Sequence, residues 1–81
     1  MPYTYILQSD KDGKYYIGSA SDLEARLARH ARGGSVATKN RRPLRLVYQR
    51  EFATTAEAIK FEKYLKSLKS HQVISDIIAG L

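Results

Sequence analysis

Several features are absent from this 81-residue chain, and each absence excludes a class of protein. It contains no cysteine, which excludes a disulfide framework and a cysteine-based zinc site and leaves packing to stabilise the fold. No segment approaches the roughly 20 apolar residues that span a bilayer. The first residues, MPYTYILQSD, lack the basic start and long apolar run of a signal peptide. We expect a soluble cytoplasmic protein with one domain over residues 1–81.

Positive charge is in excess, with a formal net charge of +6. A basic surface attracts polyanions, of which nucleic acid is the most abundant, although a small protein also gains solubility from such charge. Four cations lie in or beside a basic loop at residues 35–43, and we expect them to contact a nucleic-acid backbone without reading its sequence. They are Lys39, Arg41, Arg42 and Arg45.

The first half of the chain predicts a hairpin and a helix. Residues 3–8 and 14–18 are rich in residues that favour strands, and the turn sequence DKDG lies between them at residues 10–13. A helix is predicted to begin at Ser21, because SDLE at residues 21–24 has the capping-box pattern. The glycines at 33–34 are typical of its end.

The second half predicts a third strand and two more helices. Residues 44–52 alternate, which places Leu44, Leu46, Tyr48 and Phe52 on one side of a strand. TTAE at residues 54–57 is a second capping box, before a helix with Ala58, Phe61, Leu65 and Leu68 on its core face. Ser70 caps a short last helix. The prediction is an α+β fold with a three-stranded antiparallel sheet flanked by helices, in the order β-β-α-β-α-α.

The stretch YYIGSASDLEARLARH, residues 15–30, allows two interpretations. As scaffold, Tyr16 is a strand aromatic, Gly18 is a bend, and the helix carries a solvated polar face. As a site, the chain leaves the sheet at Tyr-Ile-Gly beside a helix whose face presents Arg26, Arg29 and His30 together. A matching tyrosine, Tyr5, lies on the partner strand.

This arrangement resembles the GIY-YIG nucleases. Tyr16-Ile17-Gly18 is the second half of their motif, and Tyr3-Thr4-Tyr5 stands where Gly-Ile-Tyr is expected. Further along the chain, Arg26, His30 and Glu62 match the family's helix arginine, a frequent histidine and the metal-binding glutamate. The resemblance covers about residues 3–68 and looks closest to the small, stand-alone single-domain group. The chain departs from the family in lacking the first glycine and, after Glu62, an asparagine that many members carry.

The resemblance implies metal-dependent hydrolysis of DNA phosphodiester bonds, with structure-specific cleavage in DNA repair or processing as a use. Glu62 would anchor a divalent cation, Mg²⁺ or alternatively Mn²⁺; one carboxylate can suffice because Mg²⁺ keeps several waters. Arg26 would clamp phosphate. Tyr5 would act as the base, Tyr16 would orient the water, and His30 would relay a proton or contact phosphate. Arg29 would join the four loop cations in binding DNA without sequence specificity.

Each assignment has a structural alternative. Glu62 could be a surface carboxylate paired with Lys66, Arg26 could pair with Asp22, and His30 could be an exposed histidine. For the whole protein the alternatives are a catalytically weak nucleic-acid-binding module and a protein-interaction adaptor. The carboxylate at position 62 favours the enzyme, and the basic loop argues against the adaptor. Specificity would come from this module or from a partner protein.

Overall fold

The structure is a computed structural model, and it describes residues 1–80. The elements follow one another as β1 (Tyr3–Ser9), β2 (Tyr15–Ala20), α1 (Leu23–Ala31), the 3-10 turn η1 (Lys39–Arg41), β3 (Leu44–Glu51), α2 (Thr55–Leu68) and α3 (His71–Ala79). The predicted α+β fold and its order of elements are confirmed. Within residues 1–80, no helix is long and apolar enough to cross a bilayer.

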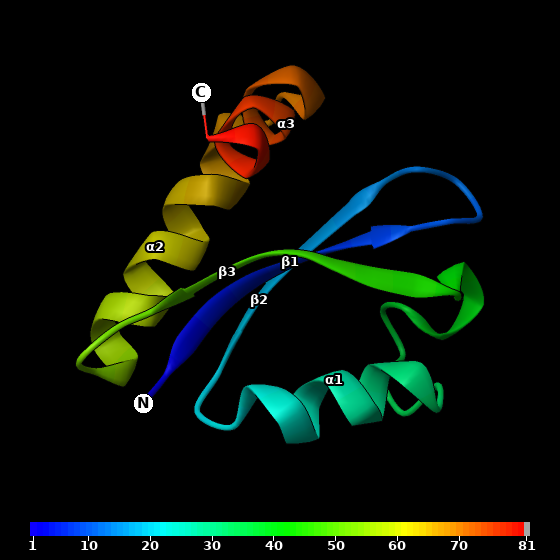
Figure 1. Cartoon of the computed structure of the whole chain (residues 1–81), viewed down its shortest axis with the longest axis horizontal. Coiled ribbons are helices and arrows are strands. Elements are labelled where there is room, and N and C mark those ends of the chain that lie inside the picture. The colour runs from blue at the N-terminus through cyan, green and yellow to red at the C-terminus, as the bar shows by residue number, and fades with distance from the viewer. Residues whose placement is uncertain (81) are drawn as a thin grey trace.

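The three strands form one antiparallel sheet in the order β2-β1-β3. The first strand of the chain is therefore central, and β2 and β3 are its edges. Tyr5 pairs with Gly18, and Leu7 pairs with Tyr16. Figure 1 shows α1 on one side of the sheet and α2 with α3 on the other. Both faces of a small sheet are thus covered, as the amount of apolar surface requires.

The alternation of side chains along β1 divides the core into two layers. Tyr5 and Leu7 pack toward α1 in one cluster with Leu23. Ile6 packs on the opposite face in a second cluster, with Leu65 and Ile74 from the last two helices. All of these residues are buried.

A hydrogen bond fixes the start of α2 against the sheet. Thr4 Oγ1, fully buried, donates to the carbonyl oxygen of Ala58 at 2.6 Å. Glu62 follows Ala58 by four residues and therefore lies on the same face of α2. The contact thus turns the Glu62 side of the helix toward the sheet.

Two of the helix N-caps are the residues predicted from the sequence, and one is a different residue. Thr54 caps α2 and Ser70 caps α3, as predicted. The first helix begins one residue later than its predicted capping box: Asp22, not Ser21, accepts a hydrogen bond from the amide of Ala25. Both residue types are good N-caps, and the strand before them runs on to Ala20, which moves the helix start forward.

The prediction for the third strand was wrong about its faces. A bulge between Ile6 and Leu7 in the pairing of β1 with β3 leaves an extra residue on β3, since Ile6 pairs with Tyr48 but Leu7 pairs with Leu46. The bulge turns Tyr48 toward α2 and α3, whereas Leu44 packs with the α1 cluster. Simple alternation cannot place these residues on one side once a bulge intervenes.

Candidate active site

Two charged side chains meet at Ser19, on the outer edge of β2. The Ser19 hydroxyl donates to Glu62 Oε1 at 2.7 Å, and Arg26 Nη1 donates to the Ser19 carbonyl oxygen at 3.2 Å. Glu62 comes from α2 and Arg26 from α1, so the two helices approach the same edge strand from opposite faces of the sheet. The alternative pairing of Arg26 with Asp22 does not occur, because the Asp22 side chain caps α1.

Three rings pack together behind this edge. The centroids of Tyr5 and Tyr16 are 6.5 Å apart, and His30 lies 5.9 Å from Tyr5 and 5.2 Å from Tyr16. A chain of hydrogen bonds joins Tyr5 Oη to His30 Nε2 at 3.0 Å and His30 Nδ1 to Thr38 Oγ1 at 2.7 Å. The two tyrosines and the histidine are thus held as one unit.

The three residues differ in how deeply they are buried. Tyr5 is 0% exposed and His30 is 2% exposed, whereas Tyr16 is only half-buried. The sequence-based alternative of an exposed His30 is therefore wrong: the histidine faces the sheet because it follows Leu23 and Leu27 at helical spacing. Complete burial of Tyr5 also argues against the choice of Tyr5 as the base, since its hydroxyl is occupied by His30.

Gly18 is needed for space and not for a turn. It lies inside β2 and has Tyr5 as its cross-strand neighbour. A Cβ atom at this position would lie 2.6 Å from Tyr5 Oη and 2.8 Å from Cζ. The expected bend at Gly18 is therefore incorrect, because the strand continues to Ala20 with the phenol of Tyr5 across the glycine.

The ionisation of the site follows from these contacts. Burial acts to raise the pKa of Glu62, but hydrogen bonds from Lys66 and Ser19 and the charges of Lys66 and Arg26 outweigh it, so the pKa is lowered. Burial raises the pKa of Tyr5, with Arg26 acting in the opposite direction. Burial lowers the pKa of His30, helped by Arg26 and Arg29. At neutral pH the site holds an anionic Glu62, a neutral Tyr5 and a neutral His30.

Lys66 occupies the second oxygen of Glu62, with Nζ 2.6 Å from Oε2. The i, i+4 pair considered from the sequence is therefore present. The carboxylate of Glu62 is nevertheless partly buried, since the Glu62 side chain is only 18% exposed. The pair and the Ser19 hydroxyl together hold both carboxylate oxygens in place at the sheet edge.

The predicted DNA-binding residues lie apart from this edge, and several have partners within the chain. Arg45 pairs with Asp10 at 2.6 Å. Arg29 and Arg42 donate to backbone carbonyl oxygens, while Lys39 is exposed on η1. Arg41 forms an ion pair with Asp12 at 3.4 Å, but it also lines a hollow that Tyr16 lines. The role of these residues in DNA binding stays a prediction.

Shallow hollows flank Glu62 at the two ends of the seam between β2 and α2. One is lined by Ser19, Arg26 and Ala58, and the other by Tyr16 and Lys66. Ala58 and Lys66 lie four residues before and after Glu62. The candidate site is therefore an open groove along an edge strand.

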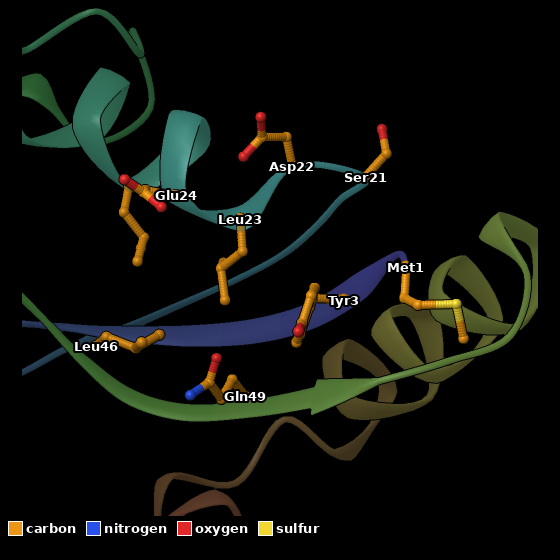
Figure 2. A pocket seen from close by; sticks show the side chains of 9 residues that line it. Met1, Tyr3, Ser21, Asp22, Leu23, Glu24, Leu46 and Gln49 are labelled. Carbon is orange, nitrogen blue, oxygen red and sulfur yellow. The ribbon is translucent and has the colours of Figure 1, made fainter.

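A further hollow of about 500 Å³ lies elsewhere, between the start of α1 and strands β1 and β3. Figure 2 shows Asp22 and Glu24 along its α1 side, with Tyr3 and Leu46 on the strands. Two carboxylates at its rim would repel phosphate, and the hollow contains none of the predicted catalytic residues. The predicted catalytic residues therefore lie elsewhere.

Within residues 1–80, no three histidine or carboxylate side chains gather closely enough to enclose a metal ion. Glu62 stays the predicted anchor of a divalent cation. The ionised, half-buried carboxylate suits a hard cation such as Mg²⁺, which takes oxygen ligands and retains several waters. Lys66 already pairs with the same carboxylate, so a cation and Lys66 would compete for Oε2.

Comparisons with known proteins identify the family to which the chain belongs. The model of the GIY-YIG catalytic domain matches residues 1–73, and the chain belongs to that family, a family of nuclease domains. It is 42% identical to a UPF0213 protein from Staphylococcus saprophyticus over 79 residues, covering 96% of this chain and 95% of the relative. A UPF0213 protein from Streptococcus pneumoniae is 42% identical over 71 residues, 86% of this chain and 71% of the relative.

A solved structure shares the fold. The solution structure of a UPF0213 protein from Bacillus halodurans aligns with a TM-score of 0.61 at 33% identity, covering 98% of this chain and 84% of that chain. The relatives place the chain in a small single-domain group of the GIY-YIG family, as the sequence resemblance indicated.

Three residues that contact or line the candidate site had not been identified from the sequence. Ser19 joins Arg26 to Glu62, and alternation after Gly18 could have placed it on the face toward the second helix. Thr38 is fully buried and holds His30, but it lies in a loop that offers no pattern. Lys69, at the end of α2, lines the hollow beside Tyr16, and nothing in the sequence singles it out.

Proposed function

We propose that this chain is a divalent-metal-dependent endonuclease that hydrolyses DNA phosphodiester bonds. The observation that carries the proposal is the junction at Ser19, where the anion of Glu62 and the cation of Arg26 are held on one residue of an edge strand. A carboxylate for a metal and a guanidinium for a phosphate are the two charges that phosphodiester cleavage needs side by side.

Arg26 binds non-bridging oxygens of the scissile phosphate, because a guanidinium is permanently charged and can donate two parallel hydrogen bonds. Its bond to the Ser19 carbonyl fixes the side chain before the substrate arrives, which lowers the cost of organising it in the transition state. Glu62 would hold the cation, which would supply electrostatic stabilisation of the negative charge that develops in the transition state.

Tyr16 is the phenol that contacts the attacking water. It is the more exposed of the two tyrosines, and it lies on β2 three residues before Ser19. Tyr5 and His30 are positioning residues in this proposal: their rings pack against Tyr16, and their hydrogen bonds fix one another. This arrangement exchanges the roles that the sequence assigned to the two tyrosines.

A DNA-binding module without useful catalysis is the alternative, and the ion pair between Lys66 and Glu62 favours it. A lysine at 2.6 Å satisfies the carboxylate without any metal. The two functions differ in whether Glu62 is needed for cleavage, since a binder would bind DNA equally well or better without that negative charge.

The deciding experiment compares Glu62→Gln with Glu57→Gln in metal-dependent nicking of plasmid, flap and branched DNA. Glu57 is an exposed carboxylate of the same helix, and glutamine retains its role in the capping box. We expect Glu62→Gln to abolish nicking while DNA binding and the melting temperature are retained, and Glu57→Gln to nick like the wild type. Equal nicking by all three proteins would remove Glu62 from the mechanism.

A further inference from the structure

A cationic hollow lies beside Tyr16, at the end of the β2–α2 seam where α2 gives way to α3. It has a volume of about 440 Å³. Its polar wall consists of Tyr16, Arg41, Lys66, Lys69 and Ser70, and the remaining lining residues are uncharged. Three positive charges therefore face one cavity that has no acidic residue in its lining.

Arg41 lines this hollow from η1, and its ion pair with Asp12 leaves part of its hydrogen-bonding capacity unused. Its Nε lies 3.4 Å from Asp12 Oδ2. Neither Nε nor Nη2 makes a hydrogen bond to the described residues, although both atoms are shielded from solvent. Unused donors of a charged group are uncommon in folded proteins, and an anion bound in the hollow is one source of an acceptor for them.

The two lysines add charge without a full internal counterpart. Lys69 forms no ion pair with any residue in 1–80. Lys66 pairs with Glu62, the same carboxylate that would anchor the cation. A cation bound by that carboxylate would compete with Lys66 for it, and Lys66 also lines the hollow.

We propose that the cationic hollow binds a phosphate of the cleaved DNA strand next to the scissile phosphate. The proposal rests on the proposed nuclease function, because Tyr16 lines the hollow and also belongs to the reaction centre. The Arg41 guanidinium donates to the phosphate oxygens, and the two lysines act as point charges around them. Such a contact reads no base but fixes the position and direction of the strand along β2.

The test uses a fluorescein-labelled DNA duplex and anisotropy in EDTA, so that binding is measured without metal-dependent cleavage. Arg41→Gln and Lys69→Gln are compared with Lys60→Gln, which removes the same charge from an exposed residue on the opposite face of α2. Each hollow variant is expected to weaken binding by roughly threefold to tenfold and to lower the salt slope by about one. Lys60→Gln is expected to bind like the wild type.

A second measurement identifies the source of the phosphate. The Nε–Hε NMR signal of Arg41 is followed in the full chain during titration with the duplex and, separately, with inorganic phosphate. The proposal expects the signal to shift with the duplex, and expects Lys69→Gln to reduce that shift. A shift with inorganic phosphate and none with DNA would overturn it in favour of a site for a free anion. No shift with either would overturn it as well.

The outcomes distinguish this proposal from the nuclease proposal. If the wild type nicks DNA but Arg41→Gln and Lys69→Gln bind like Lys60→Gln, the hollow is not a strand contact and the nuclease proposal stands. If the hollow variants weaken binding but the wild type does not nick DNA with Mg²⁺ or Mn²⁺, the strand contact stands without the nuclease. If Arg41→Gln lowers the melting temperature, loss of folded protein also weakens its DNA binding. The comparison of Lys69→Gln, at an exposed residue, with Lys60→Gln then decides the test.

Discussion

The Ser19 hydroxyl donates a 2.7 Å hydrogen bond to the Glu62 carboxylate across the seam between β2 and α2. The bond joins a strand residue to a helix residue 43 positions later in the chain. It fixes one carboxylate oxygen, and the backbone of the same serine fixes Arg26. The relative placement of the proposed metal anchor and the proposed phosphate clamp therefore depends on a single small residue.

Replacing Ser19 by alanine should weaken catalysis more than folding. The hydrogen bond to the charged carboxylate is worth about 1.5–3 kcal/mol, so metal-dependent single-turnover nicking should fall by about tenfold or more. Because this bond lowers the pKa of Glu62, that pKa should rise in the variant, which NMR titration of the carboxyl carbon detects. Ser21→Ala, at an exposed serine two residues later, should leave both quantities unchanged.

The two tyrosines should respond differently to replacement by phenylalanine. Tyr16→Phe should cut nicking by about a hundredfold, a usual cost of losing a group that handles the proton, with little change in melting temperature. Tyr5→Phe should instead destabilise the fold by about 1–3 kcal/mol, because it leaves His30 Nε2 buried without its partner. Melting curves and single-turnover nicking of both variants measure this. Full nicking activity in Tyr16→Phe would contradict the proposed role of its hydroxyl.

Stability should fall in mild acid because of His30. Burial, with Arg26 and Arg29, lowers the pKa of His30 below the ordinary 6.5. Between these two pKa values the unfolded chain binds a proton that the folded chain does not. The contribution of neutral His30 is therefore complete above pH 6.5 and is lost as the pH falls toward the folded pKa.

Thermal melts from about pH 7.5 to about pH 5, where carboxylates remain mostly ionised, measure this dependence on His30. The melting temperature of the wild type should decline over this range. The decline should be reduced in His30→Gln and should persist in His71→Gln, which changes an exposed histidine. An unchanged decline in His30→Gln would assign it to another group.

Gly18→Ala should be strongly destabilising despite adding only one methyl group. The new carbon would lie 2.6 Å from Tyr5 Oη, so the ring of Tyr5 must move and its bond to His30 must break. Overpacking of this kind costs about 1–3 kcal/mol. Denaturant unfolding of Gly18→Ala, Tyr5→Leu and the double variant should show that the double costs less than the sum. Additive costs would contradict a direct clash with Tyr5.

The order of elements could be predicted from the sequence because local signals determine it. The capping residues Thr54 and Ser70 lie where helices α2 and α3 start, and the two strands of the hairpin flank a turn sequence with glycine. The faces of β3 could not be predicted, because the bulge depends on pairing with β1 and not on the β3 sequence itself. The predicted start of α1 differs by one residue from the observed start, because Ser21 and Asp22 are both suitable caps.

The residues of the candidate site could be predicted from the sequence, but their arrangement in space could not. Tyr16, Arg26 and Glu62 could be named from spacing and family resemblance. The burial of Tyr5 and His30 could not be predicted, because it depends on how closely α1 packs on the sheet. The roles of Ser19 and Arg41 arise from contacts between segments far apart in the sequence, which no local pattern records.

The position of the site on β2 also bears on how the open edge of the sheet is protected. An edge strand presents unpaired backbone groups to which a strand of another molecule can add. Here Arg26, Glu62 and Lys66 stand along that edge, and their charges and bulk oppose such pairing. Arg26 and Glu62, which are proposed for cleavage, would thus also protect the sheet from edge-to-edge aggregation together with Lys66, and a variant that neutralises all three would lose both properties together.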